Sequence, residues 1–313
     1  MKLIITVDTE ADNQWKKEKL VTLENIFYLP RFQELAQRFG FIPTYLVTYE
    51  VAVNSEAASI LSQFQKGGNA EIGAHLHPWT TPPYQKDTAW ERKYHRFPSE
   101  LSFEELDEKM RTLTEAIKEN FGESPTSFRA GRWGLSPKVV KVLKELNYTA
   151  DSSVTPGISW HKTKGDPKGL GGPDFRHAPL FPYEISNDNI LSQGESGIVE
   201  IPVTILPTGG IIERIVRQAT GHPRWFRIFP ETTLNDLKIV YKAVLCKHLP
   251  YIQFMIHSSE LMPGGSPYAK DENAMERTFG LIRDLFSFLK EQQVDGVTIS
   301  QFALSLKKVK NES

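Results

Sequence analysis

The chain has 313 residues, of which 40% are hydrophobic and 24% charged, as in ordinary soluble globular proteins. Its formal net charge of -1 gives no reason to expect nucleic acid or an anionic membrane surface as a partner. No apolar run approaches the roughly 18 residues that a membrane span needs. The single cysteine, Cys246, excludes an intramolecular disulfide and fits a reducing compartment. Residues 1–7 are too short for the apolar region of a signal peptide, so we expect a cytoplasmic location.

The first third of the chain alternates between strand-like and helix-like patterns. Short runs of β-branched and apolar residues predict strands, and apolar residues at helical spacing predict helices. The expected elements are, in order, strand 3–7, helix 25–39, strand 42–48, helix 54–65 and strand 71–77. This alternation is typical of the βαβ units of a parallel sheet.

The remaining two thirds continue the pattern with one long interruption. Residues 80–100 are expected to form a loop, and periodicity is lost from about 155 to 197, which we interpret as an inserted loop or lid. No repeat or linker divides the chain, so residues 1–313 are expected to form a single domain. The other expected elements are helix 102–120, a short strand running into a glycine-rich turn over 127–134, helix 136–146, strands 148–153 and 198–204, helices 210–219 and 234–249, strand 251–256, helix 273–291 and strand 296–299.

Unusual polar residues cluster just past the ends of five predicted strands. In barrels of parallel strands, active sites are assembled at this face. The pair His75 and His77 is the most informative, because an extended backbone points both imidazoles to the same side. Two neutral imidazoles can share one divalent metal ion if a carboxylate completes the set. The five clusters are Asp8 with Glu10, His75 with His77, Arg129, Asp151 and His257.

Five short motifs follow one another along most of the chain: Thr6–Glu10, His75–Trp79, Phe128–Gly134, Ala150–Ser153 and Met255–Glu260. In this order they resemble the polysaccharide deacetylase superfamily, also called the NodB-homology or carbohydrate esterase family 4 superfamily. The chain looks closest to the branch of surface-polysaccharide biosynthesis proteins such as WalW and WbmS. The resemblance implies an α/β fold, a distorted (β/α) barrel of mostly parallel strands. That expectation agrees with the strand–helix alternation.

The resemblance also implies an activity, the metal-assisted removal of an N-acetyl or similar acyl group from a sugar in surface-polysaccharide or lipopolysaccharide biosynthesis. Asp8 matches the family's general base, and Arg129 matches the arginine that tethers this base. His257 matches the histidine that protonates the leaving amine. Asp151 matches the carboxylate that tunes this histidine.

The metal ligands implied by the resemblance are His75, His77 and a carboxylate. The family has two adjacent aspartates and two histidines spaced four apart, whereas here Thr9 follows Asp8 and the histidines are two apart. Glu10 is the nearest carboxylate on the same face, and Asp12 is the reserve candidate. One divalent cation is expected, zinc first, with cobalt, nickel or iron also compatible with nitrogen and oxygen ligands.

A carbohydrate substrate is the expected partner, and the oligomeric state stays open. Trp79, Arg132 and Trp133 are predicted to bind substrate, with Trp160 as a further apolar wall. Four basic residues, Arg214, Arg217, Arg224 and Arg227, are interpreted as a solvated face, with contact to an anionic substrate as the alternative.

Two other functions fit the sequence. The scaffold could hydrolyse another amide without metal, as in allantoinase-like relatives, or the chain could be an inactive member that binds a glycan or a partner. Each site residue also has a structural alternative. Asp8 could cap a helix, Arg129 could pair with a structural carboxylate, Asp151 could cap a strand end, and Trp79 and Trp133 could lie in the core.

Overall fold

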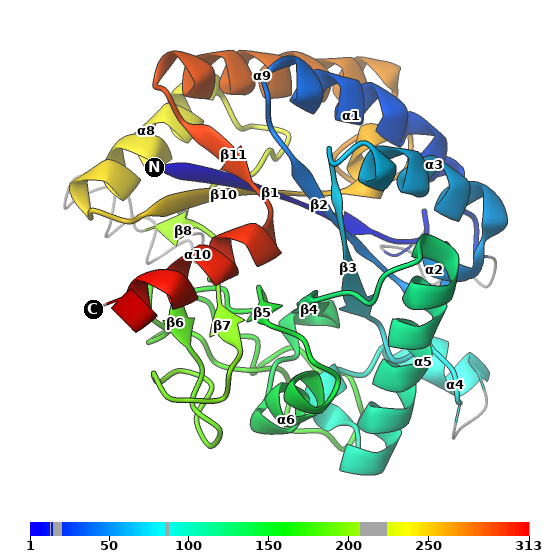
Figure 1. Ribbon diagram of the computed structural model, residues 1–313. Helices are drawn as coiled ribbons and strands as arrows, with labels where there is room; N and C mark the ends of the chain where they lie inside the picture. Colours follow the sequence, from blue (N-terminus) through cyan, green and yellow to red (C-terminus); the bar gives the residue numbers. More distant parts are fainter. Residues whose placement is uncertain (13, 15–20, 85–87, 207–223, 313) are drawn as a thin grey trace.

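A computed structural model describes residues 1–12, 14, 21–84, 88–206 and 224–312, so the helix expected at 210–219 lies outside the described residues. Its centre is a curled sheet of nine strands in the order β10-β1-β2-β3-β4-β5-β7-β6, with β11 also paired to β1 (Figure 1). All pairs are parallel except β6–β7. The strands are β1 (Lys2–Thr9), β2 (Pro43–Val47), β3 (Glu71–Leu76), β4 (Ser127–Ala130), β5 (Ala150–Asp151), β6 (Tyr183–Glu184), β7 (Val199–Glu200), β10 (Tyr251–His257) and β11 (Asp295–Val297). The expected α/β barrel of mostly parallel strands is confirmed.

Helices cover the outer face of this sheet (Figure 1). Their ends follow the expected capping chemistry: the Ser102 side chain accepts a hydrogen bond from Glu105 N at the start of α5, and Gly122 ends the helix in the left-handed conformation. The helices are α1 (Leu29–Arg38), α2 (Tyr49–Val53), α3 (Ser55–Lys66), α4 (Thr88–Tyr94), α5 (Phe103–Phe121), α6 (Pro137–Glu145), α8 (Leu234–Cys246), α9 (Glu272–Glu291) and α10 (Ile299–Glu312).

Three of these helices were not expected. Helix α2 directly follows β2, α4 lies within the predicted loop 80–100, and α10 begins where the strand predicted at 296–299 was expected to end. The two-stranded sheet of β8 (Ile205–Leu206) and β9 (Arg224–Trp225) stands beside the main sheet. No helix in the described part of the chain is long and apolar enough to cross a membrane.

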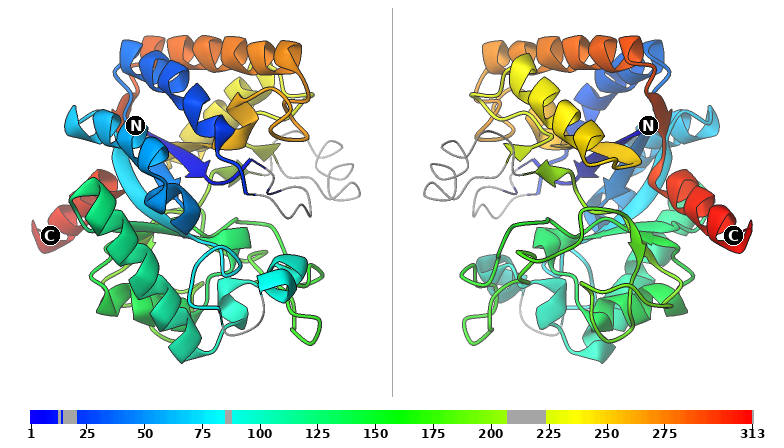
Figure 2. Two further views of the ribbon diagram at one scale, coloured as in Figure 1. Left: turned by 90° about the vertical axis from the view of Figure 1, so that its right-hand side faces the viewer. Right: turned by 90° about the vertical axis from the view of Figure 1, so that its left-hand side faces the viewer.

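The side chains of β1 alternate between two environments, as the two-residue period of a strand requires. Leu3, Ile5 and Val7 pack in the large hydrophobic core between the sheet and the helices. Ile4 belongs instead to a second, smaller apolar cluster, which includes Phe302 of α10. Helix α10 therefore packs against the barrel interior, on the side of the molecule where β1 begins (Figure 2).

Above this apolar cluster the barrel interior becomes polar. Arg129 donates to Thr6 Oγ1, to the Ser152 carbonyl and to Ser152 Oγ, and the Gln253 amide lies against the same hydroxyl. Asp8 is the next inward residue on β1 after Thr6. The interior thus runs from apolar to polar toward the ends of the strands.

The predicted insertion at 155–197 is irregular but built into the fold. It contains β6, which pairs with β7, and two isolated bridges, Ser159–Asp174 and Ile185–Gln193. The segment also supplies Trp160 and Thr163 to a cleft at the strand ends. Its movement over a substrate stays a prediction.

Candidate active site

The C-terminal ends of β1, β3, β4 and β10 meet at a cleft of about 390 Å³. Sheet register brings the polar residues together: Asp8 pairs with His257 across β1 and β10, and His75 pairs with Arg129 across β3 and β4. The backbone of β3 must also come close to its neighbours. A Cβ on Gly73, two residues before His75 on the same face, would collide with Ser127 Oγ.

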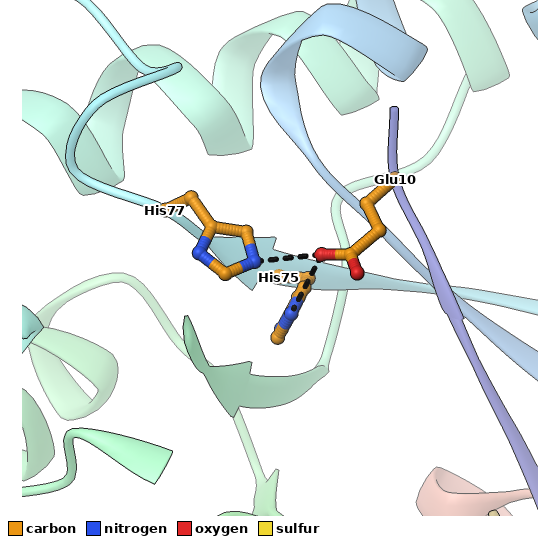
Figure 3. Close-up of side chains that lie close together, drawn as sticks. All are labelled: Glu10, His75 and His77. Atoms are coloured by element: carbon orange, nitrogen blue, oxygen red, sulfur yellow. Dashed lines mark hydrogen bonds and ion pairs between the residues drawn. The ribbon is translucent and has the colours of Figure 1, made fainter. Parts of the chain in front are cut away.

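Glu10, His75 and His77 form one buried group (Figure 3). The Nε2 atoms of His77 and His75 lie 2.7 Å and 3.8 Å from Glu10 Oε2. His75 Nδ1 lies 2.9 Å from the Arg129 carbonyl, which can only accept, so the proton is on Nδ1 and the Nε2 lone pair faces Glu10. His77 Nδ1 has no hydrogen-bond partner among the described residues. A Cβ on Gly131 would meet this atom at 2.6 Å, so a glycine is needed there.

Burial sets the ionisation of these three side chains. It lowers the pKa of His75 to about 4, against the opposing charge of Asp8. It lowers the pKa of His77 to about 3, and it raises the pKa of Glu10 to about 7, although His257 and His75 oppose that rise. At neutral pH the imidazoles of His75 and His77 are therefore neutral, and burial disfavours a full negative charge on Glu10.

These features fit a divalent metal ion. The three candidate ligand atoms all lie within 4.8 Å of one another, and two imidazoles with one carboxylate are a common catalytic zinc set that leaves positions open. Asp12 is engaged elsewhere. Its carboxylate accepts hydrogen bonds from the backbone N–H groups of Glu24 and Asn25, so it caps the 3-10 helix η1 (Glu24–Tyr28). Glu10 is the carboxylate that stands with the two histidines.

Asp8 forms a buried ion pair with Arg129. Its Oδ1 lies 2.5 Å from Arg129 Nη1, and both side chains are almost completely buried. Burial alone would raise the pKa of Asp8, but the charges of Arg129, His75 and His257 outweigh it and lower the pKa to about 2. Asp8 is therefore ionised at neutral pH, with its Oδ2 3.8 Å from His257 Nε2.

His257 is oriented by a residue to which the sequence analysis assigned no role. Its Nδ1 lies 2.7 Å from Oε1 of Glu260, which belongs to the 3-10 helix η4 (Ser258–Leu261). Arg227 Nη2 in turn donates to the same Glu260 oxygen. The interpretation of Arg227 as part of a solvated face is wrong, because only 6% of it is exposed and it lines the cleft. Arg214 and Arg217 lie outside the described residues.

Asp151 has other partners than the predicted one. Its carboxyl accepts hydrogen bonds from the backbone N–H and hydroxyl of Ser153 and forms a hydrogen bond with Glu200 on β7. Burial raises the pKa of both Asp151 and Glu200. The ring nitrogens of His257 lie near Glu260 on one side and near Asp8 and Glu10 on the other, whereas the Asp151 carboxyl is engaged with Ser153 and Glu200.

Aromatic side chains line the sides of the cleft. Trp79 stacks on His95, with ring centroids 4.3 Å apart, and Trp133 stacks on Trp160 at 6.5 Å. A fourth indole, Trp225 of β9, lies 5.8 Å from Trp133 and had not been singled out in the sequence. Such a set of apolar faces can hold a sugar ring.

The turn that carries Trp133 is strained. Arg132 and Trp133 have φ angles of 53° and 66°, which a bulky side chain rarely adopts. Arg132 lines the cleft, and its guanidinium donates to the His95 and Lys164 carbonyls and lies over the Phe97 ring. Its binding of substrate stays a prediction. These contacts tie together the loops from which the aromatic walls are built.

No protein-family model matches the sequence, and no curated protein matches it. Solved structures resemble the fold. A Mycobacterium smegmatis structure described as a polysaccharide deacetylase has a TM-score of 0.60 at 15% identity, over 99% of this chain and 91% of that one. The PuuE allantoinase has a TM-score of 0.56 at 15% identity, over 96% and 88%. The 4-alpha-glucanotransferase of Thermococcus litoralis has 0.53 at 14%, over 97% of this chain but 40% of that one. The fold is of the NodB type.

Proposed function

We propose that the protein is a metal-dependent hydrolase that removes an N-acetyl or similar acyl group from a sugar. The observation that carries this proposal is the convergence of Glu10, His75 and His77 beside the Asp8–Arg129 ion pair and His257. A divalent cation held by these three ligands, zinc first, would polarise the acyl carbonyl and make a water molecule more acidic.

The side chains of the chain itself supply the proton transfers. Asp8 is in the ionised form that can accept a proton from the attacking water, and Arg129 fixes its position. A pKa of about 2 makes Asp8 a weak base, so its action depends on the water being acidified. On the other side, His257 Nε2 can deliver a proton to the departing amine.

The substrate class rests on the aromatic walls and on the sequence resemblance. Indole faces of Trp79, Trp133, Trp160 and Trp225 suit the apolar face of a pyranose ring. The five ordered motifs favour an N-acetylated sugar, or its activated or lipid-linked precursor, in surface-polysaccharide or lipopolysaccharide assembly, as in the WalW and WbmS branch. The M. smegmatis structure of the same fold is described as a polysaccharide deacetylase. A cytoplasmic location belongs to the same proposal.

A second candidate is a metal-free amide hydrolase. Glu10 has a pKa of about 7 and lies 2.7 Å from His77 Nε2, an arrangement that could exchange protons with a substrate by itself. The PuuE allantoinase has the same fold. His77 Nδ1, which has no hydrogen-bond partner in the part of the chain that the structure describes, also differs from most metal-bound histidines, whose second nitrogen has one.

Metal analysis of the purified protein tests the proposal. We expect about one first-row divalent ion per chain, lost in the His75→Ala/His77→Ala variant because two of three ligands are removed. The matched control is His161→Ala, which removes an exposed histidine of the 155–197 segment and should leave the metal content unchanged.

The outcomes separate the candidates. A protein that stays empty after loading with zinc, cobalt and nickel, yet hydrolyses amides, is the metal-free hydrolase. A protein that binds N-acetylated saccharides without hydrolysing them is a binding protein. Metal at one per chain justifies screening N-acetyl sugar precursors as substrates.

A further inference from the structure

The surroundings of His257 define which of its nitrogens carries a proton. Nδ1 lies 2.7 Å from Glu260 Oε1, a distance at which two lone pairs would repel, so a proton must lie between them. Glu260 is 2% exposed, and Oε1 also accepts a hydrogen bond from Arg227. The imidazole therefore donates from Nδ1, and Nε2 faces the cleft.

Arg227 fixes Glu260 rather than a substrate. Its Nη2 donates to Glu260 Oε1, and its guanidinium lies over Phe229 and Tyr268, at 4.8 Å and 5.5 Å from the ring centroids. Arg227 Nη2 is also 3.3 Å from His257 Nδ1. His257 Nδ1 can form a hydrogen bond with only one of these two groups. Because it donates its proton to the closer Glu260 oxygen, it cannot also accept a hydrogen bond from Arg227.

We propose that Glu260 and Arg227 are positioning residues that keep a proton on His257 Nδ1 and hold Nε2 toward the scissile amide. This rests on the proposed function and assigns to Glu260 the role that the sequence resemblance implied for Asp151. The reasoning follows the general behaviour of carboxylate–histidine pairs, in which the carboxylate fixes the tautomer and stabilises the imidazolium.

The proposed hydrolysis involves two proton transfers, one to Asp8 and one from His257. The water oxygen forms a bond with the acyl carbon and its proton passes to Asp8. As the C–N bond breaks, the amine nitrogen takes a proton from Nε2 of the His257 imidazolium. The ring is left neutral with its remaining proton on Nδ1, held by Glu260. Without Glu260 the ring could rotate or keep its proton on the wrong nitrogen.

Nitrogen NMR of histidine-labelled protein tests the tautomer without any need for turnover. The His257→Gln variant identifies the His257 signals, and the wild type should show a protonated Nδ1. In Glu260→Leu the pattern should change to that of an unrestrained ring. Glu260→Gln keeps the shape and a carbonyl acceptor, so it provides a folded comparison if the leucine variant fails to fold. Glu276→Gln, which alters an exposed carboxylate, is the control and should leave the spectrum unchanged.

Leaving-group dependence provides the second measurement. Acetanilide needs a proton on its departing amine, whereas 4-nitrophenyl acetate releases a stable phenolate. Glu260→Gln should lower kcat/KM for the anilide about 100-fold, within the usual range for acid catalysis, and for the ester less than about 5-fold. Arg227→Met should change the ratio in the same direction by a smaller factor. Metal content should equal that of wild type in each variant.

Two results would overturn the proposal. One is a wild-type His257 with a bare Nδ1. The other is a Glu260→Leu spectrum identical to wild type or, where that variant does not fold, a Glu260→Gln variant that loses activity equally on both substrates. A wild type that hydrolyses neither probe, with the expected tautomer present and lost in the variant, would count against the proposed function while supporting the assignment of Glu260.

Discussion

Two pairs of buried acidic residues lie at or near the ends of strands in this barrel, and the two pairs have different neighbouring side chains. Asp8 and Glu10 lie at the end of β1 beside imidazoles and the Arg129 guanidinium. Asp151 and Glu200, on β5 and β7, face each other. Burial raises the pKa of Asp8, but Arg129 together with His75 and His257 outweighs burial and lowers the pKa to about 2. Arg129 also lowers the pKa of Asp151, but by less than burial raises it.

The comparison shows that partners, rather than position at a strand end, decide what a buried carboxyl group can do. An ionised Asp8 beside the cleft can accept a proton. Two carboxyls that share a hydrogen bond inside the barrel hold a proton more tightly than exposed carboxyls do, because burial of a negative charge is unfavourable. Changing the partners should therefore affect the two pairs in opposite ways.

Removal of Arg129 should have the largest effect. Arg129→Met leaves Asp8 buried without its cation and should lower the free energy of unfolding by about 3–5 kcal/mol, measured by urea denaturation. The control is Arg31→Met, which breaks the exposed pair with Glu276 and should cost less than about 1 kcal/mol. Equal losses in the two variants would contradict the importance of burial.

Acid should remove the contribution of Asp8. Its pKa falls from 3.8 to about 2 on folding, so the unfolded state binds more protons between these values. The stabilisation is fully present above pH 4 and is lost as pH falls through 2, by about 2 kcal/mol. Unfolding free energies of wild type and Asp8→Asn, measured from pH 5 to pH 2, should converge by that amount. Parallel curves would show that folding does not lower the pKa of Asp8.

Of these three variants, Glu200→Gln should change the free energy of unfolding least at acidic pH. The pH dependence of its effect should be opposite to that of Asp8→Asn. Burial raises the pKa of Glu200 above 4.5, so the folded state keeps protons that the unfolded state releases, and stability falls as pH rises. The variant lacks this loss, so its stability relative to wild type should rise by about 1.4 kcal/mol per pH unit above 4.5. The exposed residue Glu195 supplies the control, because Glu195→Gln should follow the wild-type curve. If the stability of Glu200→Gln relative to wild type falls with rising pH, the pKa of Glu200 is not raised in the folded protein.

The strands that build the site could be predicted because one face of each strand is apolar and packs against the helices, while polar site residues follow at its carboxyl end. Leu3, Ile5 and Val7 show the apolar outer face, and Asp8 follows on the inner face. The same reasoning predicts His75 and His77 on one side of their strand and His257 at the carboxyl end of its own, without knowledge of the register of the sheet. Their convergence then follows from parallel pairing.

The parts that could not be predicted depend on contacts between distant segments. Arg227 and Glu260 are 33 residues apart in the sequence, and the residues around Arg227 do not indicate that it pairs with Glu260. Asp151 matched the pattern of strand-end residues, but its carboxyl forms a hydrogen bond with Glu200 on another strand, which the sequence does not show. Helix α10 had a signal that was missed. Thr298 and Gln301 form reciprocal hydrogen bonds at its start, the spacing of a capping box.

The packing of α10 has a consequence for how the chain is made. Strand β1 pairs on one edge with β2, its near neighbour in the sequence, but its other edge pairs with β10 and β11, and Ile4 packs with Phe302, all of which come much later in the chain. A ribosome must therefore deliver residues 251–303 before the barrel can close. Until then, the nascent protein has an unpaired β1 edge that a chaperone or another chain could bind. Strand β1 thus acquires its last neighbours only when residues 251–303 have been made.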